Sequence, residues 1–192
     1  MDMSSIVIIS GGIGSGKSMV SSILRTLGYE VYDCDSRAKE IMDSDAEIKR
    51  VISQEICKDA VVDGVINRQR LAEVVFADEQ LLELLNNAVH SAVRADILSW
   101  AEGRELAFVE TAIMYQSGLD RMASQVWEVS APKELRIERV IKRNGLSRDA
   151  VEQRIDIQDA YSPERRHPSV KEVVNDDCMA LLPQVEKLVN QL

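Results

Sequence analysis

The chain has 192 residues, 45% of them hydrophobic and 29% charged, which fits one domain with a sizeable core. Its net charge of −9 and its aromatic content of 4% argue against nucleic acid or an anionic membrane as the main partner. It has no run near the roughly 18 apolar residues of a membrane span, and its three cysteines show no CxxC spacing, so we expect a cytoplasmic protein with reduced thiols.

The N-terminal part of the chain predicts strands that alternate with helices. Residues 6–9, Ile-Val-Ile-Ile, form a β-branched run that is typical of a buried parallel strand. Residues 17–27 carry apolar side chains on one helical face, and Gly28 provides a C-terminal stop. A second short strand over 30–32 and a helix over 36–42 follow.

A glycine-rich loop lies between the first strand and the first helix. Residues 11–18 read Gly-Gly-Ile-Gly-Ser-Gly-Lys-Ser and match the phosphate-loop pattern G-x-x-x-x-G-K-[ST]. Its glycines let backbone N–H groups surround a phosphate; Lys17 suits the β- and γ-oxygens of ATP, and the Ser18 hydroxyl suits Mg²⁺. A chance glycine-rich turn is the alternative, which the strand–loop–helix context disfavours. The ATP-binding residues expected here are Gly12, Ile13, Gly14, Ser15, Gly16, Lys17, Ser18 and Met19.

The rest of the chain resumes the alternation after a long helical block. Residues 45–100 are expected to be mostly helical, with breaks at Asp63-Gly64 and around Asp78. Ser147 is a good N-cap for one of the later helices. The later strands are expected over 106–110, 125–130 and 173–174, and the later helices over 133–143, 148–160 and up to Leu192.

Strands that alternate with helices predict an α/β fold with a parallel sheet. Together with the phosphate loop, this pattern predicts a P-loop kinase fold with a five-stranded parallel sheet flanked by helices. The strand order 2-3-1-4-5 is expected by analogy with other P-loop proteins. We expect one domain over residues 1–192, with a helical acceptor-binding insertion over about 43–101 and a helical lid over about 139–166.

The absence of two motifs argues against a regulatory GTPase. Neither the guanine-reading N-K-x-D nor the switch motif D-x-x-G of regulatory GTPases occurs in the chain. A small-molecule kinase needs a carboxylate that orients the acceptor and arginines that close over the phosphates. Candidates for both are present.

Three carboxylates follow predicted strands and are expected at the carboxyl rim of the sheet, where such folds bind ligands. Asp33 and Asp35 alternate on an extended segment, so both side chains are expected to face the phosphate loop; a helix N-cap is the alternative for Asp35. Glu110 ends the third strand, expected beside the first and close to Ser18, with a plain surface position as the alternative. Mg²⁺ is therefore expected on Ser18 through the nucleotide, with Asp33 or Glu110 as the candidate carboxylate.

Basic residues gather in the C-terminal third. Arg139 and Arg143 lie one turn apart on the 133–143 helix and are the expected lid cations for the transferring phosphoryl group. For Arg136 and Arg148 we expect solvated ion pairs with the interleaved acidic residues. The other arginines of this region are Arg154, Arg165 and Arg166.

Taken together, these motifs resemble those of the dephospho-coenzyme A kinase family over nearly the whole chain. Residues 11–18 have the family's wording GGIGSGKS, and Asp33-Cys34-Asp35 followed by Ala38 matches its D-x-D segment. The later matches are Asp63-Gly64 with Asn67-Arg68, then His90, then Arg139, Arg143 and Gln158, and finally Asn175-Asp176.

The resemblance implies that ATP phosphorylates the ribose 3′-hydroxyl of dephospho-coenzyme A, with Asp35 as the acceptor-orienting base. Purely structural roles remain as alternatives for two of the residues. Arg68 would form an ion pair with a nearby aspartate, and His90 would pack within its helix or cap it. The implied catalytic residues are Lys17, Asp33, Asp35, Arg139 and Arg143; the implied acceptor-binding residues are Asp35, Arg68, His90 and Glu110; and Arg143 and Asn175 join the ATP site.

The chain also departs from the family pattern. Ser91 replaces the usual proline after the histidine, and residues 110–116 replace D-x-P-L-L-F-E with Ala112 at the proline and Gln116 at the final carboxylate. Ser169-Val170 stands where the family has Ala-Asp. Because these changes leave the phosphate, metal and base positions untouched, we expect a divergent but active member.

Other functions remain as alternatives at this stage. Another nucleoside or nucleotide kinase of the same fold would share most of these features. A nucleotide-dependent binding module would share the phosphate loop, but the aspartate pair and the lid arginines disfavour it. We expect small-molecule substrates and a monomer or weak homo-oligomer.

Overall fold

The computed structural model describes residues 4–161 and 165–192, and the chain divides into two compact units. The sheet unit comprises Met1–Tyr32 and Gly103–Leu192, and the helical unit comprises Asp33–Glu102. The expected lid over about 139–166 includes residues 162–164, which lie outside the described residues, as do residues 1–3.

Five strands form the central parallel sheet of the fold. They are β1 (Ser5–Ser10), β2 (Val31–Asp33), β5 (Leu106–Glu110), β6 (Gln125–Ser130) and β7 (Val170–Val174), in the spatial order β2-β5-β1-β6-β7. β1 pairs in parallel with β5 and β6, and β6 pairs in parallel with β7. Numbered along the chain, these strands have the order 2-3-1-4-5, so the predicted sheet is confirmed; β7 is longer than expected and β2 is shifted by one residue.

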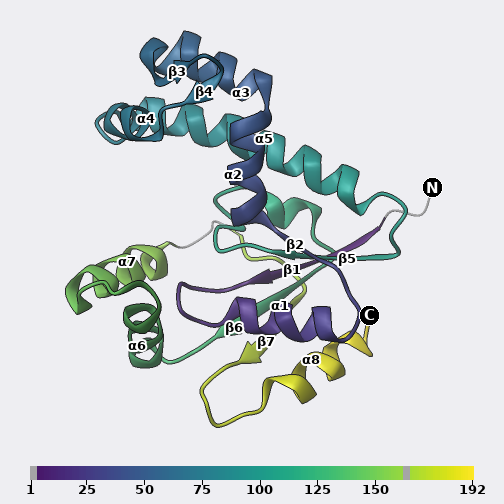
Figure 1. Cartoon of the computed structure of the whole chain (residues 1–192). Coiled ribbons are helices and arrows are strands. Elements are labelled where there is room, and N and C mark those ends of the chain that lie inside the picture. The colour runs from purple at the N-terminus through teal and green to yellow at the C-terminus, as the bar shows by residue number, and fades with distance from the viewer. Residues whose placement is uncertain (1–3, 162–164) are drawn as a thin grey trace. The chain divides into compact units, whose positions relative to one another are not determined.

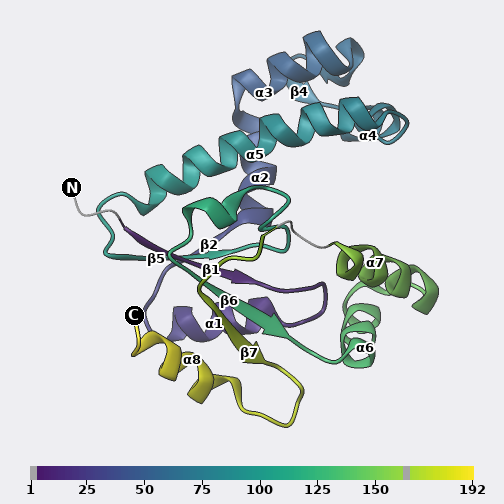
Figure 2. The same ribbon diagram turned by 180° about the vertical axis from the view of Figure 1, so that it is seen from behind.

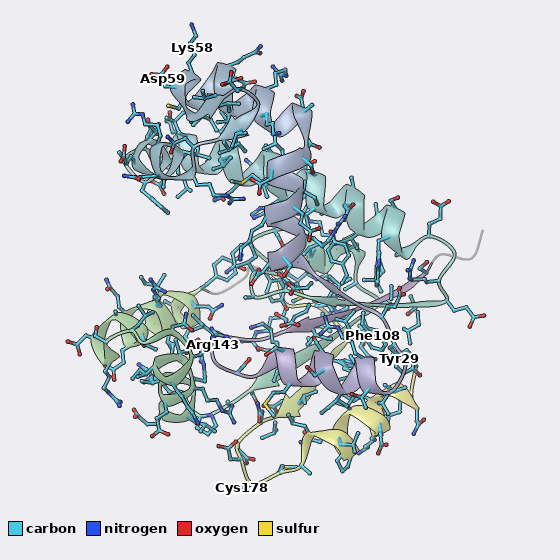
Figure 3. The ribbon with its side chains drawn as sticks, in the orientation of Figure 1. Tyr29, Lys58, Asp59, Phe108, Arg143 and Cys178 are labelled. Carbon is cyan, nitrogen blue, oxygen red and sulfur yellow. The ribbon has the colours of Figure 1, made fainter. Side chains whose placement is uncertain are left out.

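Helices α1 (Lys17–Thr26) and α8 (Leu181–Val189) cover the same face of the sheet (Figures 1 and 2). They bury apolar side chains together with those of the strands, and Tyr29 packs edge-on against Phe108 with ring centroids 5.3 Å apart (Figure 3). The buried members of this core are Val7, Ile9, Val20, Leu24, Phe108, Trp127, Val129, Val173, Leu181, Val185 and Leu188.

A smaller core lies between α6 (Lys133–Asn144) and α7 (Arg148–Ala160), which run beside each other (Figure 2). The bounds of α7 and its Ser147 cap are as predicted, since the Ser147 side chain accepts a hydrogen bond from Ala150 N. The buried members of this core are Ile137, Val140, Val151 and Ile155, and Ile13 of the glycine-rich loop packs against them. The short helix η3 (Leu119–Met122) completes the sheet unit.

The helical unit has two main helices, α2 (Cys34–Ser44) and α5 (Glu79–Ala101), joined by a bidentate pair between Arg37 and Asp96 at 2.8–2.9 Å. Asp78 caps α5, which confirms the predicted break there. The break predicted at Asp63-Gly64 is the turn of a small β-hairpin, whose two short strands were not predicted. The remaining elements are α3 (Ala46–Val51), η1 (Ile52–Ile56), η2 (Lys58–Ala60), β3 (Val61–Val62), β4 (Val65–Ile66) and α4 (Arg68–Val75).

None of the helices in the described ranges combines the length and the apolar character that a membrane span requires. The cysteines, Cys34, Cys57 and Cys178, are all free thiols.

Candidate active site

The glycine-rich loop passes so close to its neighbours that none of its four glycines has room for a side chain. A Cβ on Gly16 would lie 2.0 Å from Asn175 Nδ2, and a Cβ on Gly12 would lie 2.3 Å from Arg136 Nη2. Gly16 also has a φ of +96°, in the left-handed region where an L-residue is strained. These contacts explain why this stretch of the sequence is rich in glycine.

The loop and the first turn of α1 bring hydrogen-bond donors and a positive charge close together. Lys17 Nζ donates to Gly11 O at 2.9 Å and to Gly12 O at 3.3 Å, so its charge lies against the loop. Ser18 is exposed on the first turn of α1, where the helix dipole is positive. Met19 is 53% exposed beside it, and the Ser15 Oγ is buried without a hydrogen-bond partner among the described residues.

Asn175 joins the end of β7 to the loop. Its side chain is 4% exposed, its Nδ2 donates to Ser15 O at 2.7 Å, and its Oδ1 accepts from Arg139 Nη2 at 3.2 Å. Arg139 Nη2 also lies 2.5 Å from Asp177 Oδ1, while Arg139 Nη1 is buried without a partner among the described residues. The structure thus brings Arg139 and Asn175, both expected site residues, to the loop.

The turn after Asn175 is held by its own side chains. Backbone N–H groups of Met179 and Cys178 lower the pKa of Asp176 by donating to its carboxylate, which therefore stays ionised. Asp177 follows with a φ of +64°, a left-handed conformation that aspartate tolerates better than most residues. This turn places the Asp177 carboxylate against Arg139.

The structure contradicts the prediction that Arg136 is a solvated surface residue. Arg136 is 8% exposed, its Nε donates to Ile13 O at 2.9 Å, and its Nη atoms bind Asp159 at 2.8–3.0 Å. The signal was available in the sequence, because Arg136 lies one turn before Val140 and thus on the apolar face of α6. Arg148, by contrast, pairs on the surface with Glu134 and with Glu152, as predicted.

The second expected lid arginine does not reach the loop in this structure. Arg143 is exposed near the end of α6 and its Nε donates to the side chain of the next residue, Asn144, at 2.7 Å (Figure 3). Gln158, which was noted only as part of a family motif, does reach it: Gln158 Oε1 accepts from Ile13 N at 2.6 Å.

A cavity of about 220 Å³ opens beside the loop within the sheet unit. Its walls combine loop glycines with polar side chains from the segment after β5, from β6 and from α7, and with the cation of Arg166. The lining residues are Ser10, Gly11, Gly12, Ala112, Met114, Tyr115, Gln116, Glu128, Gln158, Asp159, Tyr161 and Arg166. Gln116, which departs from the family pattern, thus contributes to this wall.

Glu110 lies on the side of the sheet that α1 covers. It pairs with Ile9 of the adjacent strand β1, as expected. Alternate residues of a strand share a face, and Phe108 packs in the core that contains Val20 of α1, so Glu110 points to the same side. Glu128 has the opposite orientation, because its neighbours Trp127 and Val129 are the buried ones.

In the helical unit, the structure excludes the helix N-cap that was the alternative role for Asp35. Asp33, and not Asp35, is the N-cap: its Oδ1 accepts from Asp35 N at 3.0 Å and from Ser36 N at 3.2 Å, and its Oδ2 accepts from the Ser36 hydroxyl. The helix therefore starts two residues earlier than predicted, at Cys34. Asp35 lies exposed on the first turn, with its carboxylate not used for capping.

Asp35 lines a second cavity, of about 290 Å³, within the helical unit. The cations of Lys39 and Arg68 share this cavity with an apolar wall. The lining residues are Asp35, Ala38, Lys39, Met42, Arg68 and Val89. Arg68 also forms the ion pair that its residue type suggested, with Asp43 at 2.8 Å. Lys39 was missed in the sequence, although it lies one turn after Asp35 on the same helix.

His90 lies in the middle of α5, next to the cavity residue Val89. Burial, helped by the nearby charge of Arg94, lowers the pKa of His90, so its imidazole is neutral near pH 7. A neutral imidazole is a hydrogen-bonding group rather than a cation for phosphates.

The donor set suits Mg²⁺ bound mainly through a nucleotide. Mg²⁺ usually keeps several waters and takes only one or two protein ligands besides substrate phosphates. The Ser18 hydroxyl on α1 and the Glu110 carboxylate on the α1 side of the sheet fit this requirement.

The family model and the curated relatives give one family. The family model described as dephospho-CoA kinase matches residues 5–180. A dephospho-CoA kinase from Porphyromonas gingivalis is 37% identical over 183 residues, which cover 94% of this chain and 91% of that protein. Among solved structures, TT1252 from Thermus thermophilus aligns with a TM-score of 0.76 and 32% identity over 99% of this chain and 96% of its own. A dephospho-CoA kinase from Campylobacter jejuni aligns with a TM-score of 0.67 and 26% identity over 98% and 97%.

Proposed function

The chain belongs to the dephospho-CoA kinase family, and from that premise we propose that it transfers the γ-phosphate of ATP to the ribose 3′-hydroxyl of dephospho-coenzyme A. The observation that carries the proposal is that the chain has both a site suited to a nucleoside triphosphate and a site suited to an anionic acceptor with a hydroxyl group. One is a phosphate loop with Lys17 and Ser18; the other is a cavity that holds the Asp35 carboxylate beside Lys39 and Arg68.

On the donor side, the loop N–H groups and Lys17 bind the β- and γ-phosphates of ATP. Ser18, with Glu110 as the preferred carboxylate and Asp33 as the alternative, would hold Mg²⁺, whose charge would offset that of the phosphates. Both Asp33 oxygens already accept hydrogen bonds at the start of α2, which favours Glu110. Arg139, Arg143 and Asn175 complete the donor side in this proposal.

On the acceptor side, Asp35 orients the 3′-hydroxyl and receives its proton. The hydroxyl oxygen bonds to the γ-phosphorus, the bond from that phosphorus to the β–γ bridging oxygen breaks, and ADP leaves with the bond electrons. Lys39 and Arg68 are suited to the diphosphate of the acceptor, and the apolar residues of the same cavity to its uncharged parts. Because its imidazole is neutral, His90 would contribute a hydrogen bond to the acceptor and not a positive charge.

The experiment is an acceptor panel. ADP release from Mg·ATP is measured with dephospho-coenzyme A, with adenosine, with AMP and with no acceptor, and the product is checked by ³¹P NMR for a 3′-phosphomonoester. We expect rapid ADP release with dephospho-coenzyme A alone. Faster turnover of another acceptor would make the protein a different nucleoside or nucleotide kinase, and acceptor-independent slow hydrolysis would make it a nucleotide-dependent binding module. We also propose that the enzyme is cytoplasmic and that it is a monomer or a weak homo-oligomer.

A further inference from the structure

One residue of the phosphate loop, Ile13, is held through both of its peptide groups. Its N–H donates to Gln158 Oε1 at 2.6 Å, and its C=O accepts from Arg136 Nε at 2.9 Å. Its side chain packs against the small core between α6 and α7. Ile13 is therefore a point at which the helix pair is attached to the loop.

Two of these attachments differ in chemistry. Arg136 is almost fully buried and bonds in a bidentate manner to Asp159, so it ties α6, α7 and the Ile13 carbonyl into one charged, hydrogen-bonded cluster. Gln158 offers only a neutral carboxamide: its Oε1 takes the Ile13 N–H, and its Nε2 donates to Ala112 O at 3.2 Å. The Gln158 bond is thus the weaker of the two and the easier to exchange.

Ile13 belongs to the phosphate loop, whose backbone N–H groups surround a bound phosphate. Gln158 lines the 220 Å³ cavity together with Gly11, Gly12 and the cation of Arg166, so a ligand that enters this cavity meets the carboxamide. A phosphate oxygen is anionic, and charge-assisted hydrogen bonds are roughly twice as strong as neutral ones. An anionic oxygen therefore competes well with the Gln158 oxygen for this N–H.

We propose that Gln158 is a positioning residue whose side-chain oxygen holds the Ile13 N–H in place of a phosphate oxygen and is displaced from it when Mg·ATP binds. The Arg136–Asp159 pair keeps α7 attached to the loop during the exchange. Nucleotide binding is thereby coupled to the position of the Gln158 side chain and of the Ala112 carbonyl to which it donates. The proposal rests on the loop binding nucleotide, as in the proposed function, but not on the identity of the acceptor.

The test is the dissociation constant of Mg·ATP for the full chain, measured by calorimetry without acceptor. Gln158→Glu keeps the size but puts a carboxylate on the Ile13 N–H, so we expect binding at pH 8 to weaken at least tenfold. Because a glutamate carboxylate has an ordinary pKa of about 4.3, it stays ionised between pH 8 and pH 5.5, so the loss should persist over this range. Gln158→Ala removes the competing oxygen and should tighten binding about threefold.

Gln153→Glu is the matched control, since it adds the same charge to an exposed position on α7. It should change the dissociation constant less than twofold. A purely structural Gln158 would give weaker binding in both Gln158 variants. The proposal is therefore overturned if Gln158→Ala binds Mg·ATP no more tightly than wild type, or if Gln158→Glu behaves like Gln153→Glu. Acceptor-independent hydrolysis in the acceptor panel would contradict the proposed function. It would not change the dissociation constants of Mg·ATP, on which the role of Gln158 depends.

Discussion

The two units differ in how far the polar side chains of their candidate sites are buried. Around the phosphate loop, Arg136 and Asn175 are 8% and 4% exposed, and each makes several hydrogen bonds to the loop or its neighbours. Around the cavity of the helical unit, Asp35, Lys39 and Arg68 are all exposed. Backbone groups and buried side chains thus hold the phosphate loop in its conformation, whereas the polar groups of the acceptor cavity are exposed to solvent.

This difference predicts different consequences of mutation. Buried, multiply bonded groups couple stability to function, because removing one partner leaves another buried and unpaired. Exposed groups contribute little to stability, so their loss changes chemistry or affinity alone. Substitutions of the buried groups around the loop and of the exposed groups around the cavity should therefore separate in a plot of melting temperature against activity.

Gly16→Ala should have the largest effect. The new Cβ would lie 2.0 Å from Asn175 Nδ2, so Asn175 and the loop must move apart. A preorganised donor is worth about 10²–10³ in rate, and because several are displaced together we expect kcat/KM to fall by more than about 10⁴. Steady-state kinetics and calorimetry with Mg·ATP measure the loss.

Gly145→Ala is the matched control, because Gly145 has a similar left-handed φ of +65° with nothing within 4 Å of the added carbon. It should cost only the backbone strain, about 1–2 kcal/mol of unfolding free energy, with activity nearly unchanged. Equal activity losses in the two variants would mean that φ, and not the contact with Asn175, makes Gly16 necessary.

Asp35→Asn should act on chemistry without affecting the fold. The amide keeps the shape but cannot take the proton of the acceptor hydroxyl, so we expect kcat to fall by roughly 10²–10⁴. The melting temperature and the dissociation constant of Mg·ATP should stay within error of wild type. A variant that retains kcat would remove Asp35 from the base role.

The sequence predicted the sheet almost completely, for a physical reason. Strand positions and helix bounds follow from apolar periodicity, glycine stops and caps, which are local signals, and Ser147 and Asp78 cap their helices as expected. The strand order came from the analogy with other P-loop proteins. The phosphate loop was equally predictable, because it matches a local sequence pattern and three of its glycines, Gly11, Gly14 and Gly16, have positive φ.

The misses arise where a long-range contact decides a side chain's role. Arg136 binds Ile13, 123 residues away, and its burial depends on a neighbour that periodicity alone does not name. The capping of α2 by Asp33 and not by Asp35 has a different cause: the two candidate caps lie two residues apart, and helix bounds are uncertain by about that amount. The roles assigned to Arg143, His90 and Arg68 stay predictions.

Lys39→Met tests the exposed cations of the helical unit. The methionine keeps most of the length and removes the charge from the cavity that Lys39 shares with Asp35 and Arg68. An exposed charge pair is worth up to about 1 kcal/mol, so we expect the KM for the acceptor to rise about fivefold, with kcat and the KM for ATP unchanged. Lys58→Met, at the outer end of the same unit (Figure 3), is the control. A similar rise in both variants would show a general charge effect.

Asp33→Ala should give the smallest effect on turnover, and it separates the two aspartates. Asp33 caps α2 through the N–H groups of Asp35 and Ser36, and removing an N-cap costs about 1 kcal/mol. Asp33→Ser supplies a shorter acceptor for the same N–H groups and should recover most of this stability in urea titrations, because serine is also a good N-cap. If Asp33 also serves Mg²⁺, excess Mg²⁺ should restore part of any lost kcat in Asp33→Ala; if it is only a cap, Mg²⁺ should have no effect. A fall in kcat as large as that of Asp35→Asn, with stability unchanged, would show that Asp33 is the base and that its capping contacts are secondary.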